Sequence, residues 1–180
     1  MKAKRAGRQP HIVIGVDPGL SGTGWALWTR DRVRRGFDAV PAACGIVTSS
    51  RRLAWRDKIA AIEHTFVSGI IDITRWGTTT VFVEMPEWQG SAKSAMTWTT
   101  GDMQKLTYLV GYLDGCAQLW AEEFVPVPVS VWKGQLPKDV VQRRIEKIVG
   151  LDHCRALKIK SHAWDAVGIG LYGMKMKGWL

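Results

Sequence analysis

The stretch HIVIGVDPGLSGTGWALW, residues 11–28, decides how this chain folds. An apolar run rich in Ile and Val over residues 12–17 ends at a carboxylate, Asp17, and a short glycine-rich turn leads into a second apolar run over 24–29. Runs of this kind, bounded by Gly and Pro, predict two β-strands joined by a tight turn. The stretch therefore predicts that Asp17 lies at the end of a buried strand, beside a turn built from small residues.

Hydrophobic periodicity divides the rest of the chain into further strands and helices. Helical spacing follows residue 53, with apolar side chains at Ile59, Ile62, Phe66, Ile70 and Ile73. The other predicted elements are a strand within 37–48, a strand at 78–84, a helix over 106–120, a strand at 124–130, and helices from 137 to about 149 and from 161 to about 174. This order predicts an α/β fold with a five-stranded mixed sheet and helices on both faces. We expect one domain over residues 11–180 behind a basic tail at 1–10.

Positive charge is concentrated at both ends of the sequence. The net charge is +9, and residues 1–60 hold 12 Lys and Arg against 4 Asp and Glu, whereas residues 61–129 hold 3 against 8 and residues 130–180 hold 10 against 4. Such an excess suits a polyanionic partner such as nucleic acid, although a basic surface can also serve solubility alone. No apolar run approaches the roughly 20 residues that span a bilayer, so we expect a cytoplasmic protein with no membrane contact. The three widely spaced cysteines predict free thiols.

Three carboxylates and one histidine form a candidate catalytic set. Asp17 and Glu84 each end a predicted strand, and His162 precedes Asp165 by three residues on the last predicted helix. Since strand ends meet at one edge of an α/β sheet, the four side chains can share a crevice. Clustered carboxylates favour Mg²⁺ or Mn²⁺, and two such ions about 4 Å apart can hydrolyse a phosphodiester. Each residue also has an ordinary explanation, because a strand-end Asp can form a turn and a His-x-x-Asp pair can lie on a surface.

Four motifs resemble those of one family, and they occur in the family's order. DPGLSGTGW at 17–25 is similar to the first motif of the RuvC family of Holliday-junction resolvases, and VFVE at 81–84 resembles the strand that carries its second acid. VSVWKGQLPKDVVQRRI at 129–145 resembles the segment with two basic residues, and SHAWDAVGIGLY at 161–172 resembles the C-terminal motif. The resemblance covers nearly the whole chain from residue 11 to residue 174. The stretch KGQLPKD is shorter than its counterpart in the family, which suggests a divergent member, such as one encoded by a phage in a bacterial host.

The resemblance implies a fold, an activity and a set of site residues. It implies a ribonuclease H-like fold and a homodimer that uses two Mg²⁺ or Mn²⁺ ions per site to nick opposing strands of a four-way junction symmetrically. By position, the catalytic and metal-binding residues would be Asp17, Glu84, His162 and Asp165. The DNA-binding residues would be Lys133, Lys138, Trp88, Lys93 and Arg143, with Trp88 as a candidate wedge in the junction.

Several alternatives stay open at the level of sequence. Another ribonuclease H-fold nuclease, acting on RNA–DNA hybrids or branched replication intermediates, would share the acids without needing a dimer. An actin-like ATPase also has a strand-end Asp, but that fold needs a longer chain, and a non-catalytic DNA-binding module would not need the four-residue set. His162 can act as a metal ligand or as a base. The helix over 106–120 is a candidate dimer interface or an ordinary core helix.

Overall fold

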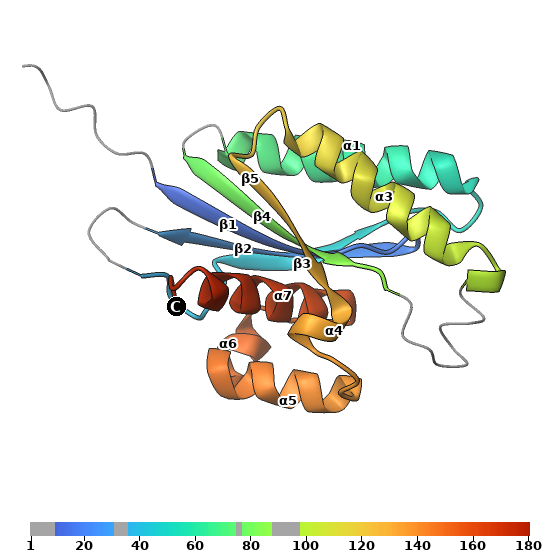
Figure 1. The fold of residues 1–180 in the computed structure, drawn as a ribbon. Coiled ribbons are helices and arrows are strands. Elements are labelled where there is room, and N and C mark those ends of the chain that lie inside the picture. The colour runs from blue at the N-terminus through green and yellow to red at the C-terminus, as the bar shows by residue number, and fades with distance from the viewer. Residues whose placement is uncertain (1–9, 31–35, 75–76, 88–97) are drawn as a thin grey trace, which may run out of the picture.

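A computed structural model describes residues 10–30, 36–74, 77–87 and 98–180 of the chain, and within 67–74 it leaves out the side chains of 67 and 70–74. The five described strands form one sheet in the order β3-β2-β1-β4-β5 (Figure 1). Their bounds are β1 His11–Asp17, β2 Gly22–Arg30, β3 Ala43–Thr48, β4 Thr78–Met85 and β5 Glu123–Pro128. β1 runs parallel to β4 and antiparallel to β2. The predicted five-stranded mixed sheet is confirmed.

Proline positions explain the extent and place of two strands. β5 is an edge strand, as Pro126 and Pro128 predict, because proline has no N–H to donate to a further neighbour. β3 is shorter than the predicted stretch at 37–48, and Pro41 lies before it rather than within it. β3 is the strand at the other edge of the sheet, and it pairs only with β2 among the described strands.

Helices cover both faces of the sheet, as predicted (Figure 1). One face carries α1 Trp55–Thr74 and α3 Asp102–Ala117, and the other carries α4 Val129–Trp132, α5 Lys138–Val149, α6 Leu151–Ala156 and α7 His162–Met176. The α1 positions predicted to be apolar are buried at Ile59, Ile62 and Phe66, whereas the side chains of Ile70 and Ile73 lie outside the described residues. The two short helices α4 and α6 were not predicted, because four to six residues are too few to show a helical period.

Helix α7 lies close against the centre of the sheet. A Cβ atom on Gly15 of β1 would come within 2.2 Å of the Ala166 carbonyl oxygen, and a Cβ on Gly24 of β2 would come equally close to the His162 carbonyl oxygen. These glycines are therefore needed because α7 backbone passes directly over them. Most of α7 is buried in the core on this face, and its first residues are held over the ends of β1 and β2.

Two simpler predictions concern cysteines and membranes. Cys44, Cys116 and Cys154 are all free thiols, as their spacing predicts. Within the described ranges, no helix has the length and apolar character required to cross a bilayer.

Candidate active site

Asp17 and Glu84 lie beside each other at one edge of the sheet. β1 and β4 are parallel neighbours, and their register pairs Val16 with Val83, the residues immediately before the two acids. Asp17 is the last residue of β1, and its side chain is buried, with 6% of the residue exposed. The prediction that these two strands are adjacent is confirmed, and it brings the two carboxylates to the same crevice.

Helix α7 adds the other two residues of the predicted set. His162 is its first residue, and His162 Nδ1 lies 2.7 Å from Asp17 Oδ2. Asp165 follows one turn later and is buried, with 8% exposed. The imidazole reaches Asp17 because Gly24 lets the α7 backbone approach β2, so the glycine of the sequence motif has a structural role here.

The turn after Asp17 is held by a threonine hydroxyl. Thr23 is fully buried; its Oγ1 donates to the Gly19 carbonyl oxygen at 3.1 Å and accepts from the Gly19 N–H at 3.4 Å. This pair of bonds closes the loop between β1 and β2 and fixes where β1 ends. The threonine and glycines of the motif therefore shape the loop and admit α7.

The ammonium group of Lys133 forms ion pairs with two of the acids. Lys133 Nζ donates to Glu84 Oε2 at 3.2 Å and lies 3.7 Å from Asp165 Oδ1. Lys138 Nζ lies 3.7 Å from the other Asp165 oxygen, on a side chain that is 55% exposed. A positive charge thus already lies between carboxylates that would otherwise repel one another.

Asp17, Glu84 and His162 each have a pKa above the ordinary value of the group. Burial raises the pKa of Asp17 even though the hydrogen bond to His162 opposes that rise. Burial, followed by repulsion from Asp17, raises the pKa of Glu84 from 4.5 to about 7. The hydrogen bond to Asp17 raises the pKa of His162. Each shift favours keeping a proton at the site, because burial disfavours the charged carboxylates and the Asp17 carboxylate stabilises a protonated His162.

The carboxylates and the imidazole of the site are side chains that bind divalent cations, but they are not grouped closely enough to chelate one. Among the residues that the structure describes, no three His, Cys, Asp or Glu side chains are grouped closely enough to hold a metal ion. The Lys133 ammonium contacts both Glu84 and Asp165 in the space between them. Buried carboxylate oxygens are the ligands that Mg²⁺ and Mn²⁺ prefer, so a divalent ion and the ammonium would compete for the same oxygens.

The predicted DNA-binding residues fall into three groups. Trp88 and Lys93 lie outside the described residues, so the wedge prediction is not tested. Arg143 lies on the exposed side of α5, and its guanidinium forms an ion pair of 2.6 Å with Asp139 one turn earlier. Lys133 and Lys138, in contrast, both contact the acids.

One contact of the site was missing from the sequence prediction. The Trp132 indole Nε1–H donates to Glu84 Oε2 at 2.9 Å. Its position directly before Lys133, in a segment where basic residues were expected, was the available signal. The contact itself depends on how α4 packs against α7, which the sequence pattern does not reveal.

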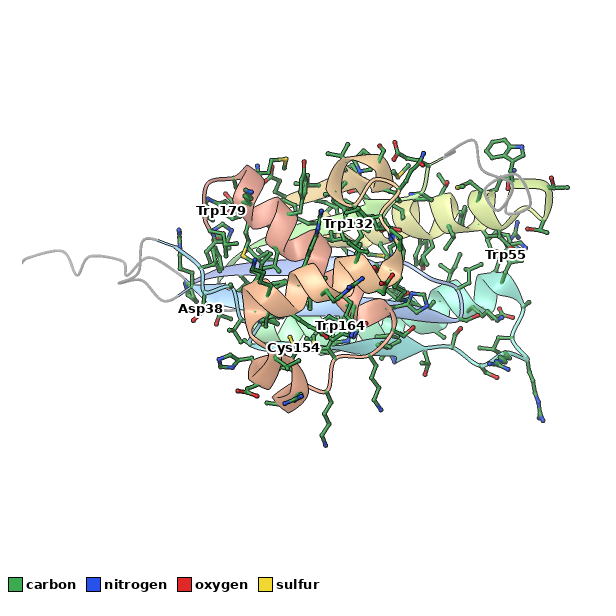
Figure 2. The ribbon with its side chains drawn as sticks, turned by 90° about the horizontal axis from the view of Figure 1, so that it is seen from below. Asp38, Trp55, Trp132, Cys154, Trp164 and Trp179 are labelled. Atoms are coloured by element: carbon green, nitrogen blue, oxygen red, sulfur yellow. The ribbon has the colours of Figure 1, made fainter. Side chains whose placement is uncertain are left out.

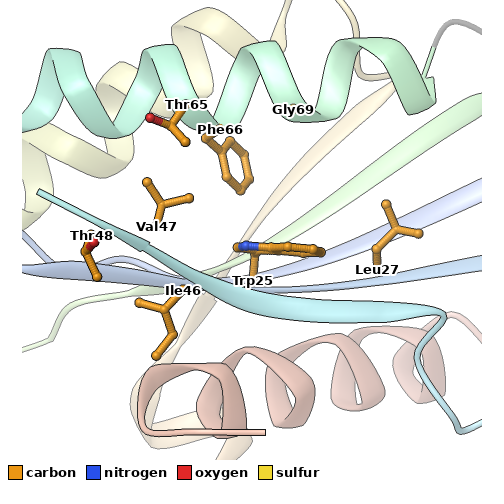
Figure 3. A pocket seen from close by; sticks show the side chains of 8 residues that line it. All are labelled: Trp25, Leu27, Ile46, Val47, Thr48, Thr65, Phe66 and Gly69. Carbon is orange, nitrogen blue, oxygen red and sulfur yellow. The ribbon is translucent and has the colours of Figure 1, made fainter. Parts of the chain in front are cut away.

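An apolar cavity lies elsewhere in the molecule. About 440 Å³ of space opens between α1 and strands β2 and β3, on the side of the sheet opposite α7 (Figure 3). Its lining is mainly apolar, and it contains none of the four predicted site residues; the lining residues are Trp25, Leu27, Ile46, Val47, Thr48, Thr65, Phe66 and Gly69. The candidate site is instead a crowded polar crevice at the strand ends.

Comparison with solved structures identifies the fold. The structure titled "Thermus thermophilus RuvC structure" matches with a TM-score of 0.63 and 18% sequence identity, over 93% of this chain and 97% of that chain. The chain has a ribonuclease H-like fold. A second structure, "T. thermophilus RuvC in complex with Holliday junction substrate", matches with a TM-score of 0.58 and 17% identity, over 93% of this chain and 96% of that chain. No protein-family model matches this sequence, and no curated protein matches it.

Proposed function

We propose that this protein is a metal-dependent endonuclease that resolves four-way DNA junctions by paired symmetric nicks. One observation carries the proposal: β1, β4 and α7 bring Asp17, Glu84, His162 and Asp165 to a single crevice that also contains two lysines. The similarity in fold to a RuvC that was solved with a Holliday junction supports this substrate. The ordered sequence motifs also support it, because they contain these four residues.

The residues of the crevice divide the chemistry among them. Asp17, Glu84 and Asp165 would hold Mg²⁺ or Mn²⁺, and such ions, when bound, activate water and stabilise the charge that develops on a phosphodiester. Asp17 also fixes His162 through Nδ1, which leaves Nε2 free to accept a proton from water or to bind an ion. Lys133 and Lys138 would neutralise the scissile phosphate, since both already approach the carboxylates.

Further cations lie at the same edge of the sheet. β3 ends at Thr48, which pairs with Gly22 at the end of the turn after Asp17. Ser49 Oγ donates to the carbonyl oxygen of Leu20 in that turn at 2.5 Å. The loop tied down in this way carries Arg51 and Arg52, whose side chains are exposed and form no ion pair with a described carboxylate. Arginines on this side and lysines on the α4–α5 side flank the acids, as phosphate contacts along a DNA strand require.

The outer face of α3 suits a homodimer. Leu109, Val110 and Leu113 bury the inner face of this helix, whereas Tyr108 and Tyr112 remain 53% and 38% exposed. Exposed aromatic side chains are typical of protein interfaces, and two symmetric nicks need two active sites. The proposed dimer places α3 of each copy at the contact.

The test of the proposed function is cleavage of a panel of substrates. The purified protein is incubated with Mg²⁺ or Mn²⁺ and a labelled four-way junction, a fork, a linear duplex or an RNA–DNA hybrid. Paired nicks at symmetric positions of the junction, with the duplex left intact, support the proposal. Equal cutting of the RNA–DNA hybrid would replace it by a different ribonuclease H-fold activity, and no cutting of any substrate would reject it.

A further inference from the structure

One indole connects the carboxylate of β4 to the helices beneath the sheet. Trp132 Nε1 donates to Glu84 Oε2 at 2.9 Å, and Lys133 Nζ donates to the same oxygen at 3.2 Å. Both described donors therefore act on Oε2. The other oxygen of the carboxylate, Oε1, receives neither bond, so the two donors orient Glu84 without occupying it fully.

The indole ring is held in place by a glycine on α7. Trp132 lies on the α7 side of the sheet (Figure 2). A Cβ atom on Gly168 would come within 2.6 Å of Cζ3 of the ring, so the helix has no side chain where the ring lies against it. Gly168 follows Asp165 by three residues, which places the two on the same side of the helix. The ring that orients Glu84 therefore rests one turn away from a second acid of the site.

The same ring also contacts the lysine that lies among the acids. Lys133 Nζ is 4.6 Å from the centroid of the Trp132 ring, within the range of a cation–π contact, while it also lies 3.7 Å from Asp165. One side chain thus restrains Glu84 through its N–H and Lys133 through its ring face. Glu87 helps to hold this segment, because its Oε2 accepts from the Ser130 N–H at 2.8 Å.

We propose that Trp132 is a positioning residue that prepares Glu84 for a divalent cation. The inference rests on the proposed function, since it assumes that Glu84 is a metal ligand. A carboxylate that is already oriented by fixed donors loses less freedom when it binds an ion, and partners of this kind commonly change metal affinity or activity about 10- to 100-fold when they are removed. Phenylalanine would keep an aromatic ring beside α7 and would lose the N–H together with part of the volume of the indole, and Trp28→Phe loses the same atoms.

The chain supplies a matched control in Trp28. This indole is buried, whereas Trp132 is partly buried; its ring also lies against a glycine of α7, Gly170, and its Nε1 donates to the Ala39 carbonyl oxygen at 3.3 Å instead of to a carboxylate. Removing the N–H of Trp28 tests the loss of a buried indole hydrogen bond without touching the acids. A purely structural role for Trp132 would make the two variants behave alike.

The experiment measures Mn²⁺ binding to the full-length protein by isothermal titration calorimetry, without DNA. We expect Trp132→Phe to weaken Mn²⁺ binding about 10- to 100-fold, and Trp28→Phe to bind Mn²⁺ as the wild type does. Thermal melting of both variants shows whether each is folded. If Trp132→Phe does not fold, Gly168→Ala is tested in the same way, since it keeps the N–H and displaces the ring, and the same weakening is expected.

The outcomes separate this inference from the proposed function. Equal Mn²⁺ affinity in folded Trp132→Phe and wild type overturns the positioning role, as does equal weakening in Trp132→Phe and Trp28→Phe. A wild-type protein that binds Mn²⁺ but cuts no junction rejects the proposed substrate and leaves the positioning role to be judged on affinity. A wild-type protein that binds no Mn²⁺ overturns both.

Discussion

Asp17 Oδ2 and His162 Nδ1 lie 2.7 Å apart, although 145 residues separate them in the chain. Asp17 is buried at the end of β1, and the side chain of His162 is 43% exposed at the start of α7. The carboxylate thus fixes one imidazole nitrogen and leaves the other toward the solvent side of the crevice. A turn-forming aspartate at a strand end would have no reason to be buried against a histidine from the other end of the chain.

Replacing Asp17 by asparagine should abolish cutting and preserve folding. Asp17→Asn removes a charge that would hold a metal and orient His162, so we expect junction cleavage to fall by more than about 100-fold. The melting temperature should not fall, because the change removes a buried carboxylate that repels Asp165. Single-turnover cleavage in Mg²⁺ and thermal melting measure the two effects, and the variant should still bind the junction in Ca²⁺. Asp152→Asn on α6, whose side chain is 99% exposed, is the matched control and should cut normally.

The stability of the metal-free protein should decrease as pH rises. The pKa of Glu84 is raised from 4.5 to about 7, so the folded state binds this proton more tightly than the unfolded state does. Its contribution is fully present below 4.5 and is lost as pH rises through about 7, with a ceiling of about 3 kcal/mol. The raised pKa values of His162 and Asp17 act in the same direction.

Urea unfolding between pH 4.5 and pH 8 measures this dependence, with EDTA present to remove metal ions. Glu84→Gln cannot titrate at this position and keeps an oxygen for the Trp132 N–H, so its unfolding free energy should vary less with pH than that of the wild type. A wild-type curve that rises over this range would show that the acids are stabilised as carboxylates, in contrast to the environment that the structure gives them.

The sequence predicts that Asp17 and Glu84 meet at one edge of the sheet, because local patterns show where each strand ends. Asp17 and Glu84 each close an apolar run, and that is enough to place them at one edge once β1 and β4 pair. The contacts within the crevice depend instead on long-range packing. Trp132 reaches Glu84 only because α4, too short to show a helical period, packs on a glycine of α7. The ribonuclease H-like fold itself was available from the motifs, which the fold comparison supports.

A side chain on Gly24 should separate α7 from the sheet. In Gly24→Ala the new Cβ would lie within 2.2 Å of the His162 carbonyl oxygen, which is backbone and cannot rotate away. We expect a loss of about 1–3 kcal/mol in unfolding free energy, as for other overpacked cores, together with slower cutting because His162 moves from Asp17. Gly69→Ala on α1, where nothing lies within 4 Å of the added atom, should be neutral or stabilising by up to about 1 kcal/mol.

The exposed tyrosines of α3 should control assembly. Replacing Tyr108 and Tyr112 together by alanine removes two exposed rings that stack with a centroid distance of 6.4 Å; it keeps the buried leucines of the helix and also removes the edge contact of 5.4 Å between the rings of Tyr108 and Trp55. We expect the double variant to dissociate at concentrations at which the wild type is dimeric, as measured by sedimentation velocity. A wild-type protein that stays monomeric when bound to a junction would reject both the dimer and symmetric nicking.

The two arginines after β3 should contribute to DNA affinity through charge alone. Arg51 and Arg52 are exposed, and the loop that carries them is tied to the turn after Asp17 by the bond from Ser49 to Leu20. If each contacts one phosphate, changing both to alanine should reduce the slope of log affinity against log salt by about two, since each contact releases about 0.9 counterion. Binding to a junction in Ca²⁺, measured over a range of KCl concentrations, gives this slope. Arg155→Ala, which removes an exposed arginine on α6, should leave the slope unchanged. An unchanged slope in the double variant would place the DNA path away from the β3 side of the acids, on the side of Lys133 and Lys138 only.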